Sequence, residues 1–126
     1  MEAEELMIGD WVKFPIGNDK VVDLPYIEGR GVCASFAASA TLFPVEVYKL
    51  EPIPLTPEIL EKNGIEKDGP APQGLQVWAT RVGGRRFKIF EWVASGTFVV
   101  FDTEIRYVHE LQHALRLCGI EKEIVI

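Results

Sequence analysis

Two histidines and a glutamate near the end of the chain have the spacing of a metal site. His109-Glu110-Leu111-Gln112-His113 places the imidazoles four residues apart with a carboxylate between them. Residues four apart share one face of a helix, so both histidines can reach a single zinc ion. The glutamate can then act as general base on a metal-bound water. The spacing is therefore compatible with a zinc-dependent hydrolase in which His109 and His113 bind the metal and Glu110 is catalytic.

A catalytic zinc also needs a third protein ligand, which the sequence after His113 does not supply. In the extended metzincin pattern HExxHxxGxxH, Arg116 stands in the place of the glycine and Gly119 in the place of the third histidine. Thermolysin-like enzymes take a glutamate from a later helix, but Glu121 and Glu123 lie too near for that arrangement. An acidic ligand from the N-terminal half is permitted. Zinc therefore stays an alternative, and the main prediction includes no cofactor.

The helix that carries this string has an apolar stripe at spacings of three and four residues. The stripe consists of Val108, Leu111, Leu115 and Cys118. At about 100° of rotation per residue, these side chains point to the core. His109 and His113 then fall on nearly the opposite side, which predicts that they face solvent or a partner.

A second group of chemically interesting residues surrounds the Gly83-Gly84 pair. It is basic and consists of Arg81, Arg85, Arg86 and Lys88. Together with the aromatic residues Trp78, Phe87 and Phe90, it could form a hairpin that stacks and neutralises single-stranded nucleic acid. The alternative is a solvated turn whose charges keep sheet edges from pairing. Because the whole chain has a net charge of -6, we expect the second interpretation and hold nucleic-acid binding as an alternative.

Composition limits the remaining possibilities. The chain has 126 residues, 48% of them hydrophobic, which predicts one folded domain. The acidic start MEAEELMIGD does not resemble a secretory signal, and no apolar run is long enough for a membrane span, so we expect a cytoplasmic protein without membrane contact. Cys33 and Cys118 belong to no CxxC pair and are predicted to be buried free thiols.

The pattern of apolar and turn residues predicts an α+β fold dominated by strands. Residues 6–50 are predicted to form short β runs over 10–14, 20–24, 31–37 and 45–50, with a turn at Gly17-Asn18-Asp19, which is typical of a meander or an SH3-like barrel. Thr56, Pro57 and Gly64 predict a linking helix over 57–63, followed by a polar loop over 66–74. Residues 75–126 then form the C-terminal β-plus-helix part.

Within this C-terminal part we expect a hairpin, two further strands and a helix. The predicted ranges are strands 75–81, 85–93, 97–101 and 104–107, a helix over 108–118, and an edge strand over 124–126.

Three segments carry a resemblance to a known group of proteins. They are Leu6-Met7-Ile8-Gly9-Asp10-Trp11-Val12, Ile53-Pro54-Leu55-Thr56 and Tyr107-Val108-His109-Glu110-Leu111-Gln112. In this order they resemble small uncharacterised proteins of gut Gram-negative anaerobes and their integrated phages. The resemblance implies the same sequence of a β-rich part, a linking helix and a β-plus-helix part. It implies no activity, cofactor or site residue.

The predicted function is that of a non-enzymatic binding or adaptor module, with a phage or mobile-element context. The apolar end Ile124-Val125-Ile126 suggests self-association or a protein partner through an exposed edge strand. The zinc hydrolase and the nucleic-acid hairpin are the two alternatives.

Overall fold

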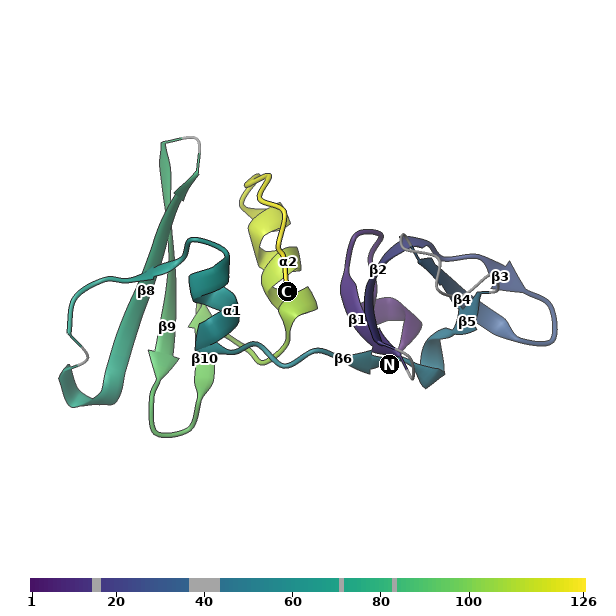
Figure 1. Ribbon diagram of the computed structural model, residues 1–126, viewed down its shortest axis with the longest axis horizontal. Coiled ribbons are helices and arrows are strands. Elements are labelled where there is room, and N and C mark those ends of the chain that lie inside the picture. The colour runs from purple at the N-terminus through teal and green to yellow at the C-terminus, as the bar shows by residue number, and fades with distance from the viewer. Residues whose placement is uncertain (15–16, 37–43, 71, 83) are drawn as a thin grey trace. The chain divides into compact units, whose positions relative to one another are not determined.

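The computed structural model describes residues 1–14, 17–36, 44–70, 72–82 and 84–126 (Figure 1). The chain divides into two compact units, Met1–Ile53 and Pro54–Ile126. Each unit contains an antiparallel sheet, and both α-helices of the described residues belong to the second unit, so the predicted α+β class is confirmed. None of the helices in the described ranges has the length and apolarity to cross a membrane.

The first unit is a small β structure with strand order β3-β4-β2-β1-β6, in which β5 pairs with β4. Its strands are β1 (Trp11–Phe14), β2 (Gly17–Asp23), β3 (Tyr26–Ile27), β4 (Gly31–Phe36), β5 (Val45–Glu46) and β6 (Glu51–Pro52). Two 3-10 turns, η1 (Ala3–Glu5) and η2 (Val47–Lys49), complete it. The predicted β-rich character is confirmed, whereas the SH3-like arrangement stays a prediction.

Two details of this unit differ from the sequence prediction. Gly17, Asn18 and Asp19, expected as a turn, belong to β2 and pair with β1. The strand expected over 45–50 ends at Glu46 and continues as η2. Ala37, the predicted last residue of the preceding strand, lies outside the described residues.

The core of the first unit is formed by side chains from its strands and turns. Its buried members are Leu6, Val12, Phe14, Val21, Ala34, Phe36, Val47 and Leu50. The rings of Phe14 and Phe36 stack at 4.7 Å between centroids. This contact joins β1 to β4, which are separated in the sheet by β2.

The second unit combines one sheet with two helices. The strand order is β11-β10-β9-β8-β7. The strands are β7 (Glu66–Lys67), β8 (Leu75–Val82), β9 (Arg85–Trp92), β10 (Thr97–Val100) and β11 (Thr103–Ile105). The helices are α1 (Pro57–Lys62) and α2 (Val108–Leu117), and the 3-10 turn η3 (Pro72–Gly74) precedes β8. The predicted hairpin, the two following strands and both helices are therefore confirmed, with ends shifted by a few residues.

Helix α1 forms where the sequence predicted it, for the predicted reason. The Thr56 hydroxyl accepts a hydrogen bond from the Ile59 amide at 3.3 Å, and Pro57 occupies the first turn. Gly64 follows with φ +74°, a conformation that costs glycine little. The polar loop expected over 66–74 is wrong in part, because Glu66–Lys67 forms β7 and pairs with Trp78 and Ala79.

The second sheet has one buried and one open side. Alternate residues of a strand point to opposite faces. The inner face carries buried apolar side chains, namely Trp78, Phe87, Ile89, Phe98 and Val100. Figure 1 shows both helices on one side of this sheet. The other side, which we call the open face, carries the outward residues of β8, β9 and β10.

The C-terminal tail is not the edge strand that the sequence suggested. Residues 119–126 form no strand, and Ile124 is buried with 1% of its surface exposed. The Asn63 side chain accepts a hydrogen bond from the Val125 amide and donates one to the Val125 carbonyl, both at 2.7 Å. The backbone amide and carbonyl of Val125 are thus bonded to a side chain. They are not available to pair with a strand of a second copy, which was the reason to expect self-association at this segment.

Candidate functional site

The HExxH string lies on α2 as predicted, but its first histidine is not on the surface. His109 is only 3% exposed, so the expectation that it faces solvent is wrong. Its ring stacks on that of Tyr107, the residue before the helix, at 5.8 Å and 9°. The burial of a residue in the first turn of a helix thus depends on the residues before the helix as well as on the helix face. His113 is half-buried, and its ring meets that of His109 edge-on at 5.6 Å.

Glu110 caps the N-terminus of α2. One oxygen of its carboxylate accepts hydrogen bonds from the backbone amides of Arg106 at 2.9 Å and Tyr107 at 3.1 Å. Tyr107 is the N-cap residue, whose amide a helix leaves without an internal partner, so the carboxylate acts as the second half of a capping box. The bond from the Arg106 amide adds a contact with the residue before the cap. Arg106 also pairs with Glu104, a hydrogen bond that raises the pKa of the guanidinium above its ordinary value.

A third ligand for the two histidines is not found within the part of the chain that the structure describes. No group of three or more His, Cys, Asp or Glu side chains is placed there to hold a metal ion. The residues that the HExxH motif supplies therefore do not come together with the acidic partner that a catalytic zinc would need.

The basic hairpin has a different electrostatic setting from the one that the whole-chain charge suggests. Met1–Ile53 contains four basic and nine acidic residues, a net charge of -5. Pro54–Ile126 contains nine basic and ten acidic residues, a net charge of -1. The acidity of the chain is thus concentrated in the first unit, and it is a weaker argument against anion binding by the second.

The four basic side chains of this hairpin do not form a single surface. Arg85 belongs to the inner face and donates a hydrogen bond to the Cys118 carbonyl at the end of α2, at 2.8 Å. Arg86 belongs to the open face and forms an ion pair with Asp68. Arg81 lies directly opposite Arg86 in the register of β8 and β9, and Lys88 is exposed two residues further along. Gly83 of the predicted turn lies outside the described residues.

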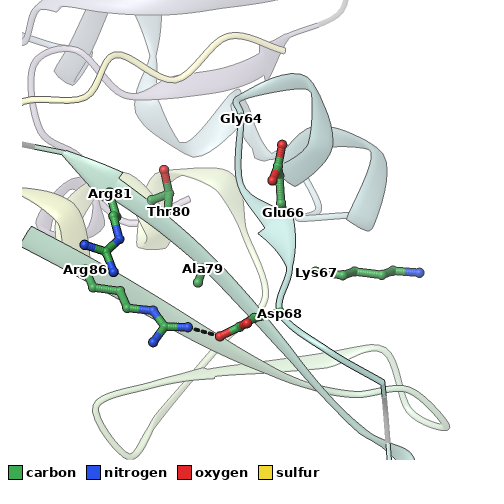
Figure 2. A pocket seen from close by; sticks show the side chains of 8 residues that line it. All are labelled: Gly64, Glu66, Lys67, Asp68, Ala79, Thr80, Arg81 and Arg86. Carbon is green, nitrogen blue, oxygen red and sulfur yellow. Dashed lines mark hydrogen bonds and ion pairs between the residues drawn. The ribbon is translucent and has the colours of Figure 1, made fainter.

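One pocket flanks the hairpin on the side of β7. This β7-side pocket has a volume of about 490 Å³, and its charged lining comes from Glu66, Lys67, Asp68, Arg81 and Arg86. Figure 2 shows Arg81 and Arg86 extending from their strands, Asp68 meeting the guanidinium of Arg86, and Lys67 pointing away. Opposite charges are already mixed here, so the pocket is polar without being strongly cationic.

A second pocket flanks the hairpin on the side of β10. This β10-side pocket has a volume of about 400 Å³. Its apolar lining comes from Phe87, Phe90, Val99, Phe101 and Ile120. Lys88, Arg85, Arg86 and Asp102 add charges, and Cys118 contributes from the end of α2. Apolar walls with a few charged groups are typical of ligand sites.

The apolar rows of the open face were missed from the sequence. Cross-strand register places Val77, Phe90 and Val99 in one row and Leu75 and Trp92 in the next. Trp92 is 48% exposed and the others are half-buried. The period-two alternation of β8 and β9 indicates two distinct faces. Both faces carry an apolar pair, Trp78 and Ile89 on one and Val77 and Phe90 on the other, so alternation alone does not indicate which of them the helices cover.

The two cysteines also differ from each other. Cys33 is fully buried, as predicted. Cys118 is only half-buried and lines the β10-side pocket, so the prediction of a buried thiol is wrong there. It follows the last residue of α2, where the apolar stripe leaves the core.

Comparisons with known proteins give no family. No family model matches the sequence, and neither the curated proteins nor the solved structures include a match. The resemblance to small proteins of gut anaerobes and phages thus stays a prediction.

Proposed function

We propose that this chain is a binding module, without catalysis of its own, that holds a partner protein on the open face of its second sheet. The observation that carries the proposal is the distribution of exposed apolar groups. Trp92, Phe90 and Val99 occupy neighbouring positions on the face opposite to the side on which Figure 1 shows α1 and α2. Contiguous exposed apolar surface with polar residues at its edge is typical of protein interaction sites.

The chemistry of the open face also describes the partner. Along β9 the outward side chains run from Arg86 and Lys88 to Phe90 and Trp92. A complementary surface would place carboxylates opposite the basic end and apolar side chains opposite the aromatic end. We therefore propose a polypeptide that combines acidic and apolar residues as the occupant.

Single-stranded nucleic acid is the alternative occupant of the same face. The order of basic and aromatic residues along β9 favours it, because bases stack on aromatic rings and phosphates bind cations. Glu66 and Glu104 disfavour it: their register partners, Ala79 and Val99, place them on the open face as well. Carboxylates among the phosphate contacts would oppose a polyanion.

The test uses a display library of random peptides as the probe and the full chain as the target. We expect the selected peptides to be rich in acidic and apolar residues. Trp92→Ser should weaken their binding by about tenfold or more, because exposed tryptophans often dominate interface energies. Leu117→Ser is the matched control, since Leu117 is 88% exposed on α2, and it should leave the affinity unchanged.

Two outcomes would contradict the proposal. One is a selection that recovers no peptide, or only peptides whose affinity is the same for the wild-type and Trp92→Ser chains. The other is tight binding of a labelled mixed-sequence single-stranded DNA, with an affinity that falls steeply with salt and is lost in Trp92→Ser. That result would replace the protein partner with nucleic acid.

A further inference from the structure

The free edge of β9 offers a more specific mode of recognition. We infer that an extended segment of the partner adds to this edge as a strand between Arg85 and Ile89, with carboxylates on one of its faces and apolar side chains on the other. The inference rests on the proposed function and names how and by what sequence pattern the partner is held.

The edge is open because β10 is shorter than the hairpin beside it. β8 pairs with β9 over its whole length, from Arg85 to Trp92. On its other side, β9 pairs with β10 only at Phe90, Glu91 and Trp92. Within the described part of the second sheet, Arg85 to Ile89 have no strand neighbour on that side. In an antiparallel sheet, every second residue of this stretch directs its amide and carbonyl groups away from β8, toward the unpaired edge. An added strand would form its backbone hydrogen bonds with these groups.

β10 leaves β9 at a strained turn. Val100 and Thr103 pair across a two-residue connection in which Phe101 has φ +51° and Asp102 φ +63°. Positive φ at both positions is typical of type I′ turns, which favour asparagine and glycine, whereas an ordinary side chain costs about 1–2 kcal/mol there. Strain of this kind is concentrated at binding and catalytic sites. Stability alone does not explain a phenylalanine at this position.

Phe101 is one of the residues that line the β10-side pocket. It is 68% exposed, and it contacts the buried Phe87 edge-on at 6.0 Å between centroids. Phe87 belongs to β9 itself, within the open stretch of the edge. The pocket of about 400 Å³ therefore adjoins the edge where a strand would add, and its volume is within the range of ligand pockets.

The two faces of β9 determine the pattern of the added strand. Directly opposed residues of neighbouring strands share a face. A residue beside Phe87 would point toward the inner side, where Ile120 also lines the pocket, and is expected to be apolar. Residues beside Arg86 and Lys88 would point to the open face. The Arg86 guanidinium is already paired with Asp68, so the exposed Lys88 ammonium is the cation that a carboxylate of the added strand would meet. The segment is thus expected to alternate acidic and apolar residues.

The first experiment titrates the full chain with a blocked peptide that alternates glutamate and isoleucine. We expect binding, and at least about tenfold slower hydrogen exchange at alternate amides of residues 85–89, because each new ladder bond protects its donor. A peptide with lysine in place of glutamate should not bind. Equal binding of the lysine peptide would overturn the charge assignment.

N-methylated peptides separate strand addition from docking by side chains. In a strand, the amides of alternate residues face the same neighbour. Methylation of the glutamate amides in one peptide and of the isoleucine amides in another should therefore abolish binding in one case and spare it in the other. If both peptides bind like the parent, strand addition is overturned, although the open face can still hold a partner.

Variants of the chain test the two ends of the site. Lys88→Glu should weaken peptide binding by about tenfold. Arg81→Glu is the matched control on β8 and should change the affinity by less than about twofold, because β9 lies between β8 and the added strand and charge effects decline with distance. Equal losses in the two variants would overturn the assignment to this edge.

Phe101→Asn has a signature that a merely structural role would not produce. Asparagine suits the first position of a type I′ turn, so we expect Tm to rise by a few degrees while peptide affinity falls. A fall in both quantities would mean that Phe101 serves the fold. One further outcome separates the two proposals. If none of the alternating peptides binds, while the display library still yields peptides whose binding is lost in Trp92→Ser, only the strand-addition inference is overturned.

Discussion

The two units bury their apolar residues in different ways. In the first unit, Val22 on β2, Tyr26 on β3 and Tyr48 on η2 are exposed on separate elements, and Met7 and Ile8 are exposed in the segment before β1. In the second unit, Trp92 shares the open face with the half-buried Phe90 and Val99. Scattered apolar residues need no functional explanation, whereas a contiguous group does. This difference supports the proposal that the second unit, and not the first, binds a partner.

Charge separates the units in the same direction. The first carries a net charge of -5 and the second one of -1. An acidic partner would be repelled by the first unit and less so by the second, and long-range charge influences encounter more than final affinity. The acidity of the chain thus favours approach of such a partner to the surface that also carries the apolar groups.

The strongest test of this comparison removes a large core residue from each unit. Trp78 is fully buried, and its indole donates a hydrogen bond to Glu91 at 3.0 Å. Trp78→Ala should lower the free energy of unfolding of the second unit by about 3–5 kcal/mol. Phe14→Ala, which removes the ring stacked on Phe36, should have an effect of similar size in the first unit.

Hydrogen exchange followed by mass spectrometry can assign each loss to a unit. We expect faster exchange in the second sheet for Trp78→Ala and in the first sheet for Phe14→Ala, because each unit has its own buried core. Uniform acceleration over the whole chain in both variants would contradict the division. The two units would then unfold as one cooperative structure.

A smaller effect is expected from the residue that holds the C-terminal tail. The buried Asn63 amide bonds the Val125 backbone in both directions and also donates to the Ile59 carbonyl at 2.8 Å. Asn63→Ala leaves these buried groups without their partner, which costs about 2 kcal/mol. Urea unfolding should show this loss, and exchange should accelerate at Val125.

Lys62 provides the control for this prediction, since it also contacts the tail. Its ammonium donates to the Ile126 carbonyl at 2.8 Å, but at an exposed position. Lys62→Ala should cost less than about 0.5 kcal/mol, as is usual for exposed polar contacts. Equal losses in the two variants would show that burial of the Asn63 amide is not the cause.

The sequence predicts what short-range rules determine. Thr56, Pro57 and Gly64 delimit α1 because capping and backbone preferences operate within a few residues. The β8–β9 hairpin is likewise recognisable from its alternation and its glycine turn.

Long-range contacts account for what the sequence does not predict. The Asn63 side chain replaces a strand partner for Val125, which is 62 residues away. β7 is short and charged, and it is recognisable only through its pairing with Trp78 and Ala79. The candidate site depends on such contacts too: the basic cluster is visible in the sequence, but the division of Arg85 and Arg86 between two faces follows from which side of the sheet meets α2.

The smallest expected effect is a dependence of the stability of the first unit on acidic pH. In the first unit, the hydrogen bond from the Arg30 guanidinium to Glu46, at 2.8 Å, is the main cause that lowers the pKa of this carboxyl from 4.5 to about 2. A lowered pKa stabilises the folded state above the pKa of the unfolded chain, and this contribution is lost as the pH falls through the folded value. The contribution of Glu46 should thus decline between about pH 4.5 and pH 2.

Glu46→Gln tests this directly in the first unit. At neutral pH the variant should be less stable than the wild type, because the amide cannot replace the charged acceptor. The difference should shrink as the pH falls below 4.5 and vanish only below about pH 2, where the Glu46 carboxyl of the folded chain becomes protonated. Arg30→Gln should show the same profile, and the double variant should lose little more than either single one, since both remove one interaction. Hydrogen-exchange rates in the first sheet measure the stability of this unit at each pH. If the stabilities of the wild type and Glu46→Gln change with pH in parallel, the Arg30–Glu46 pair contributes nothing to folding.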